Sequence, residues 1–160
     1  MDSNGCQPKS IPTLAIGSDH GGFRMKQHLI RTLSDDLGLT LSDEGCFSTD
    51  SVDYPDIAVA VGRAVQGRVC QFGLMIDGAG VGSTMVLNRL AGIRAALCHD
   101  SFTTRNSRAH NNANVLVLGS NVVHQGEAVR LVKLWLNTPF EGGRHLRRVE
   151  KIDALDGSNR

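Results

Sequence analysis

The stretch Phe72-Gly-Leu-Met-Ile-Asp-Gly-Ala-Gly-Val-Gly-Ser83 contains the features from which both the fold and a ligand site can be predicted. Its first part, Phe72 to Ile76, is an apolar run typical of a buried strand. Three glycines follow at alternate positions: Gly78, Gly80 and Gly82. Such glycines leave backbone N–H groups free to turn toward an anion where a helix begins. The stretch therefore predicts a strand, a candidate loop for a phosphate or an oxyanion, and a helix, although a plain tight turn would use the same glycines.

Short β-rich runs of this kind alternate with helical patterns along the chain. We expect five buried strands, at Thr13 to Gly17, Leu39 to Ser42, Phe72 to Ile76, Ile93 to Cys98 and Val115 to Leu118. Alternation of strands and helices is typical of a parallel sheet covered by helices. The sequence therefore predicts an α/β protein, a three-layer Rossmann-like sandwich with a five-stranded parallel sheet. Ligands of such open sheets bind beyond the carboxyl ends of the strands.

Five helices are expected between and after these strands. The first starts near Gly22, where apolar residues recur every four positions. The others are expected after Asp53-Tyr54-Pro55, around Ser83, from Ser101 to about Ala109, and from about Gly126 to Leu136. The last of them is apolar on more than one face, which predicts a subunit contact.

Composition favours one globular domain without a polyanionic partner. With 160 residues, 41% of them hydrophobic, the chain fits a single domain, which we assign to residues 11–160. Residues 1–10 are polar and show no periodicity, so we interpret them as a flexible N-terminal extension. The net charge of +1 provides no long-range attraction, and 4% aromatic residues offer few stacking surfaces. We therefore expect no nucleic acid and no membrane among its partners.

The cysteines and the start of the chain bear on its compartment. Cys6, Cys46, Cys70 and Cys98 form no C-x-x-C pair, which argues against a structural zinc site and favours reduced thiols. The chain opens with no basic-then-apolar leader, and no apolar run approaches the ~20 residues of a membrane span. We therefore expect a cytoplasmic protein.

Polar residues follow the first expected strand and precede the fifth. Asp19 and His20 come directly after the first strand, where they would form a proton-transfer pair or a helix N-cap beside an exposed histidine. His110 and Asn111 stand just before the fifth strand, where a histidine is more often a hydrogen-bonded turn residue than a catalyst. From the residues alone, the helix N-cap is the favoured interpretation of Asp19 and the turn residue that of His110.

Three arginines lie within five positions in the segment Gly142-Gly-Arg-His-Leu-Arg-Arg148. Guanidinium groups match the geometry of a phosphate, so this segment is a candidate phosphate site. A solvated basic face or a nucleic-acid patch would have the same composition, and the near-zero net charge disfavours the patch.

The glycine loop does not match the known nucleotide-binding patterns. A dinucleotide fingerprint requires a glycine where Ser83 stands, and a P-loop requires a Gly-Lys-Ser/Thr sequence that does not follow here. We therefore expect no nucleotide cofactor.

Together these residues resemble the ribose-5-phosphate isomerase B family, which includes both subunits of galactose-6-phosphate isomerase. The motifs that carry the resemblance are Gly17-Ser-Asp-His-Gly-Gly22, Ser51-Val-Asp-Tyr-Pro55, Gly92-Ile-Arg-Ala-Ala96, His110-Asn-Asn-Ala-Asn114 and Gly142-Gly-Arg-His-Leu-Arg-Arg148. The resemblance implies aldose–ketose isomerisation of a sugar phosphate, such as ribose 5-phosphate to ribulose 5-phosphate, through a cis-enediolate. It also implies that no metal or cofactor is needed, and that the chain forms dimers or tetramers with shared active sites.

The resemblance further implies roles in proton transfer and charge stabilisation. Asp19 and His110 would assist opening of the sugar ring. Asn111 and the N–H groups of the loop from Gly78 to Gly82 would stabilise the enediolate oxygen. Tyr54 would line the site.

The phosphate of the substrate would be held by a separate set of residues. By the same resemblance, His20, Arg144 and Arg148 would bind it, with His145 close by.

Two positions depart from the family pattern. Most members carry Cys-Gly-Thr-Gly, with the cysteine as the C–H base, where this chain has Asp77-Gly-Ala-Gly80. We expect Asp77 to replace that base, since a carboxylate performs this task in other sugar-phosphate isomerases. The alternative follows the A subunit of galactose-6-phosphate isomerase, which resembles this chain in having aspartate there and needs a partner chain. Asn121 stands where ribose 5-phosphate-binding members usually have a phosphate-contacting arginine, so the preferred sugar stays open.

Overall fold

The computed structural model describes residues 13–157 and contains a five-stranded sheet. The strands are β1 (Thr13–Ser18), β2 (Thr40–Gly45), β3 (Phe72–Asp77), β4 (Ala95–Leu97) and β5 (Val115–Gly119). They are ordered β2-β1-β3-β5-β4, and every neighbouring pair is parallel. The predicted five-stranded parallel sheet is therefore confirmed, whereas the predicted extension at residues 1–10 lies outside the described residues.

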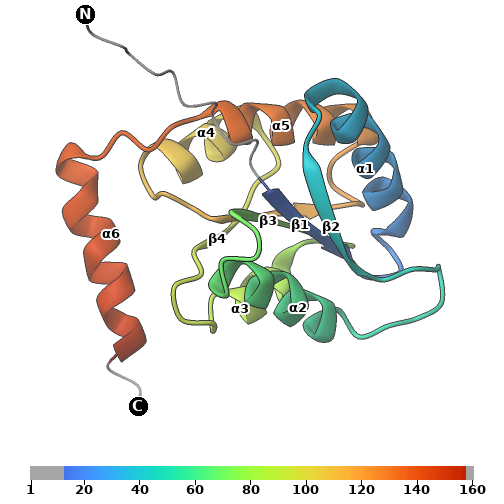
Figure 1. Cartoon of the computed structure of the whole chain (residues 1–160), viewed down its shortest axis with the longest axis horizontal. Helices are drawn as coiled ribbons and strands as arrows, with labels where there is room; N and C mark the ends of the chain where they lie inside the picture. The colour runs from blue at the N-terminus through green and yellow to red at the C-terminus, as the bar shows by residue number, and fades with distance from the viewer. Residues whose placement is uncertain (1–12, 158–160) are drawn as a thin grey trace, which may run out of the picture.

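Helices cover both faces of the sheet (Figure 1). They are α1 (Phe23–Leu37), α2 (Tyr54–Gln66), α3 (Val81–Leu87), α4 (Ser101–Ala109), α5 (Gln125–Asn137) and α6 (Leu146–Asp153). Helices α1, α4 and α5 lie on one face and α2 and α3 on the other, which confirms the three-layer α/β sandwich. None of the helices within residues 13–157 is long and apolar enough to span a membrane.

Alternation along the strands creates a separate core on each face. In β3, Leu74 and Ile76 pack under α1 and α5, while Met75 packs under α2 and α3. Successive side chains of a strand point to opposite faces, so an apolar run without polar interruptions buries both faces. This arrangement leaves the strand ends as the places where polar side chains can gather.

The structure differs from the sequence-based expectation at three elements. Strand β4 is shorter than the expected Ile93 to Cys98, and β2 runs on to Gly45, beyond the expected end at Ser42. Helix α6 was not predicted, because its few apolar residues are separated by charged ones. It stands to one side of the sandwich (Figure 1), joined to it by an ion pair of 2.7 Å between Arg94 and Asp153.

Candidate active site

The glycine loop between β3 and α3 has a backbone that only glycine tolerates at two points. Gly80 has a φ of +78°, and a Cβ there would lie 2.3 Å from a methyl carbon of Leu97. At Gly82 a Cβ would lie 2.5 Å from Cζ of Tyr54. The Tyr54 ring therefore packs directly on the loop, as expected for a residue that lines the same site.

Asp77 ends β3 and lies beneath this loop with only 5% of its surface exposed. Its Oδ1 accepts hydrogen bonds from the N–H groups of Ala79, at 2.9 Å, and of Gly80. Its Oδ2 accepts from the N–H of Ser83, at 3.2 Å, and from the Ser83 hydroxyl. A carboxylate has about four acceptor sites, so Asp77 is saturated by donors of its own loop.

Because of these contacts, only some of the N–H groups of the loop remain free to bind a ligand. The N–H groups of Ala79 and Gly80 point inward to Asp77. Those of Val81 and Gly82, in the first turn of α3, find no acceptor among the described residues. Of the predicted oxyanion donors of the loop from Gly78 to Gly82, the N–H groups of Ala79 and Gly80 are therefore excluded.

Asp19 and His20 lie beside this loop at the carboxyl ends of β1 and β3. The N–H of Asp19 donates to the carbonyl of Ile76 at 3.1 Å, which ties the two strand ends together. Oδ1 of Asp19 accepts from the N–H of Gly22 at 2.9 Å, but the N-cap of α1 is Gly22, so this bond closes the turn before the helix and does not cap it. The Nδ1 atom of the exposed His20 ring accepts from the N–H of Val52 at 3.3 Å, which leaves its Nε2–H able to donate to an anion.

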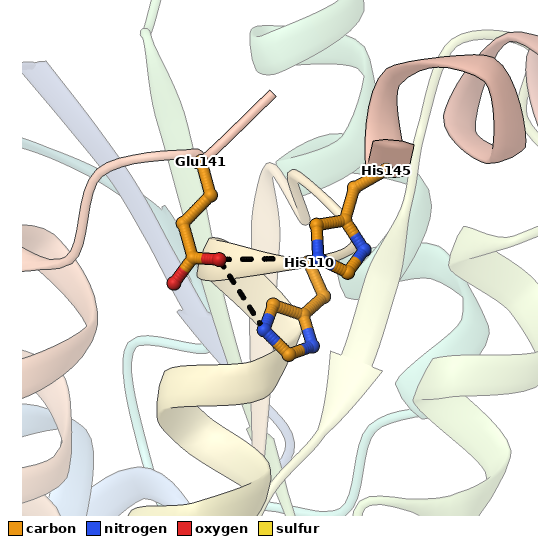
Figure 2. Close-up of side chains that lie close together, drawn as sticks. All are labelled: His110, Glu141 and His145. Carbon is orange, nitrogen blue, oxygen red and sulfur yellow. Dashed lines mark ion pairs between the residues drawn. The ribbon is translucent and has the colours of Figure 1, made fainter. Parts of the chain in front are cut away.

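A second group of predicted residues forms around His110, at the end of α4. The ring of His110 stacks on that of His145, with centroids 4.1 Å apart and an interplanar angle of 9°. Figure 2 shows Glu141 reaching both rings, with its Oε2 3.5 Å from Nε2 of His110 and 3.8 Å from Nε2 of His145. Burial, followed by the neighbouring His110 and Arg144, lowers the pKa of His145. The neutral form of His145 is therefore favoured near neutral pH.

The remaining predicted residues of this group are exposed and near His110. The Asn111 side chain donates to the side-chain oxygen of Asn106 at 3.0 Å, and Nδ1 of His110 lies 3.0 Å from the Asn106 amide nitrogen. Arg144 approaches His145, its Nε donating to Nε2 of that ring at 3.5 Å, and Arg148 extends from α6. Sequence reasoning missed Asn106 and Glu141, since neither falls in a pattern with a known chemistry.

Within one chain the two groups lie at opposite ends of the parallel strands, which we call the carboxyl edge and the amino edge of the sheet. Asp77 is paired with Gly119 at the carboxyl edge, whereas Asn114, just after the His110 segment, contacts Gly73 at the amino edge. The four residues of strand between these levels correspond to about 13 Å. One chain therefore brings together Asp19, His20, Tyr54, Asp77 and the glycines, and separately His110, Asn111, Arg144, His145 and Arg148, but does not bring the two groups together.

Comparison with known proteins identifies the family. A model of the ribose/galactose isomerase family matches residues 14–152. The chain belongs to this family. Ribose-5-phosphate isomerase B of Escherichia coli is 41% identical over 143 residues, covering 89% of this chain and 95% of the relative. The solved structure of ribose-5-phosphate isomerase B from Clostridium thermocellum superposes with a TM-score of 0.90 at 40% identity, covering 92% of this chain and 99% of that one. A D-erythrulose-4-phosphate isomerase of Pectobacterium atrosepticum is 36% identical over 144 residues, covering 88% of this chain and 92% of the relative.

Family membership confirms the resemblance drawn from the motifs. The described cysteines, Cys46, Cys70 and Cys98, are free and buried, and none lies in the glycine loop. Burial also raises the pKa values of the Cys70 and Cys98 thiols, which disfavours their thiolate forms. None of these three therefore supplies a cysteine to the glycine loop.

Asn121, where the resemblance predicts an arginine, lies next to the glycine loop. Its N–H donates to the carbonyl of Gly78 at 3.0 Å. Its side chain lines a pocket together with Arg24 and His124. Asn121 therefore lies beside the candidate site, where it offers an amide and no charge.

Proposed function

We propose that the chain interconverts ribose 5-phosphate and ribulose 5-phosphate, or a closely related aldose and ketose phosphate, through a cis-enediolate. The observation that carries this proposal is that the two groups of side chains supply different chemical functions. The carboxyl-edge group offers carboxylates and loop N–H groups, while the amino-edge group offers imidazoles and exposed guanidinium groups. An isomerase of phosphorylated sugars needs both sets.

The two sets meet, in this proposal, at the contact between two copies of the chain. Each site takes its carboxyl-edge group from one copy and its amino-edge group from the other. Exposed apolar residues on α6, Leu146 at 47% and Ile152 at 44%, support a contact between copies on this side of the molecule. The proposed assembly is a homo-oligomer, a dimer or a tetramer, with shared active sites.

The chemistry assigns a proton transfer to each carboxylate. Asp19 and His110 assist opening of the sugar ring, and Asp77 moves a proton between C2 and C1 of the open chain. The N–H groups that begin α3, with Asn111, stabilise the oxygen on which negative charge develops.

Two further steps complete this assignment: binding of the phosphate and release of Asp77 from one of its hydrogen bonds. His20, Arg144 and Arg148 hold the phosphate. For Asp77 to accept a proton from carbon, one of its four donors must leave, and the Ser83 hydroxyl is the one that can rotate away without moving the backbone.

A second candidate function is a subunit that needs a different partner chain, as in galactose-6-phosphate isomerase. The saturated carboxylate of Asp77 favours this alternative, because it describes a residue that organises the loop. Under this alternative a related chain with cysteine at the position of Asp77 supplies the base.

Isomerisation by the purified chain in the presence of a chelator tests the two functions. Ribose 5-phosphate is the first substrate, with four- and six-carbon sugar phosphates in parallel. Turnover by the single chain supports the proposal and names the sugar. A folded chain that is silent on every substrate contradicts it and favours the partner-dependent subunit.

Mixing of two inactive variants tests the shared site. Asp77→Asn disables the carboxyl-edge group and His110→Ala the amino-edge group. If these come from different copies, half of the dimers in an equal mixture are mixed and each contains one intact site, so about a quarter of wild-type activity returns. A mixture that exchanges subunits and stays inactive contradicts the shared site.

A further inference from the structure

His110, Glu141 and His145 bring three metal-binding groups to one point. The ligand atoms of the three side chains all lie within 4.8 Å of one another. Figure 2 shows that a single carboxylate oxygen faces Nε2 of both rings, at 3.5 Å and 3.8 Å. These distances are longer than the ~2.7–2.9 Å of a charge-assisted hydrogen bond. The three groups therefore converge without satisfying one another.

We propose that this cluster is a binding site for Zn²⁺ or a similar divalent transition-metal ion, and that the bound ion inhibits the enzyme. Two imidazoles and one carboxylate are a ligand set that zinc accepts, with water completing the coordination. The inhibition rests on the proposed function, because it follows from the roles given to His110 and His145. The binding itself does not depend on that function.

Two of the three distances between ligand atoms are already near those of a zinc site. Zinc at about 2.0–2.2 Å from each ligand places tetrahedral neighbours ~3.4 Å apart. The His110–Glu141 distance of 3.5 Å already fits, and the His145–Glu141 distance of 3.8 Å must close by a few tenths of an ångström. Because the rings are stacked, one must turn to aim its nitrogen at the ion. His110 is the one with space, since its side chain is 37% exposed and that of His145 only 7%.

Two neighbouring residues affect the affinity of this site. Nδ1 of His110 lies against the Asn106 side chain, whose amide must present its oxygen to Nδ1–H when Nε2 binds the ion. Arg144 donates to Nε2 of His145 at 3.5 Å and must leave that atom. Because Arg144 competes with the ion, Arg144→Ala should bind zinc more tightly than the wild-type chain.

Titration of the purified chain with ZnCl₂ tests the site directly. We expect one ion per chain by calorimetry, with binding weakened ~10-fold or more by His110→Ala and by Glu141→Gln. His124→Ala is the matched control, because His124 is an exposed histidine outside the cluster, and it should bind zinc as the wild-type chain does. Glu141 is exposed, so its variant remains informative even if substitution of the buried His145 prevents folding.

Activity measured in parallel separates the two proposals. Zinc should inhibit isomerisation and a chelator should restore it, with Mg²⁺ having no effect. An inactive wild-type chain that binds zinc through these residues contradicts the proposed function but supports the metal site. An active chain whose zinc affinity is unchanged in His110→Ala and Glu141→Gln overturns the metal site.

Discussion

Asp77→Asn should destabilise the protein by an amount that follows from its four donors. The amide oxygen of the introduced asparagine can still accept hydrogen bonds from the N–H groups of Ala79 and Gly80. Its amide nitrogen then faces Ser83. The Ser83 hydroxyl can rotate and accept from that nitrogen, but the Ser83 N–H is left buried without an acceptor. One such group costs about 2 kcal/mol. In a domain of this size, 2 kcal/mol corresponds to a melting temperature lowered by roughly 4–8 °C.

Thermal unfolding followed by calorimetry measures this change. Asp19→Asn is the matched control, because Asp19 accepts one hydrogen bond in the loop after β1 and its carboxylate is less buried. Its melting temperature should fall by less than that of Asp77→Asn. An Asp77→Asn protein that melts with the wild type would refute the conclusion that this carboxylate holds the glycine loop.

Three further changes test separate parts of the site. Ser83→Ala frees one acceptor site of Asp77, so turnover should be retained or increased if Asp77 is the base, and a loss of turnover with normal folding would contradict that role. Arg148→Ala should raise KM about tenfold or more, as expected for one charge-assisted contact of ~1.5–3 kcal/mol, while Arg147→Ala serves as its control and equal KM values would refute the placement. Because the folded-state pKa of His145 is lowered, the protein should lose stability as pH falls below the unfolded-state pKa of ~6.5. Urea unfolding at pH 7.5 and 5.5 should show this loss, and an equal loss in His145→Gln would contradict its assignment to His145.

The sheet and helices α1 to α5 could be predicted because strands and helices differ in the spacing of their apolar residues. Helix α1 has buried residues spaced by four, including Met25, Leu29 and Leu33, and β3 is an unbroken apolar run. Helix α6 escaped prediction because it buries Val149 and little else of its own side chains. A helix that stands beside the sandwich shows little apolar periodicity, since this periodicity arises from burial of one helix face.

The residues of the candidate site were proposed largely from motifs, but their division between two ends of the strands was not predicted. The rule that ligands bind at the carboxyl ends of strands places Asp19 and Asp77 correctly. Applied to His110 it fails, because that residue precedes β5 and lies at the amino edge. The sequence feature that indicates the amino edge is the position of His110 before a strand instead of after one. The four donors around Asp77 could not be predicted, because residue types do not reveal where the N–H groups of a glycine loop point.

The placement of Arg148 connects the proposed assembly with the chemistry. Arg148 lies on α6, between Leu146 and Val149, and the exposed Ile152 follows one turn later. Residues three apart on a helix lie near one face, so the exposed Leu146 and Ile152 flank the already buried Val149 and form an apolar stripe with the arginine beside it. Docking this stripe on a second copy would immobilise the helix and hold Arg148 at a fixed position relative to that copy. The same contact that buries the apolar residues would then order the phosphate-binding group, so that activity and assembly should be lost together when Ile152 is changed to aspartate.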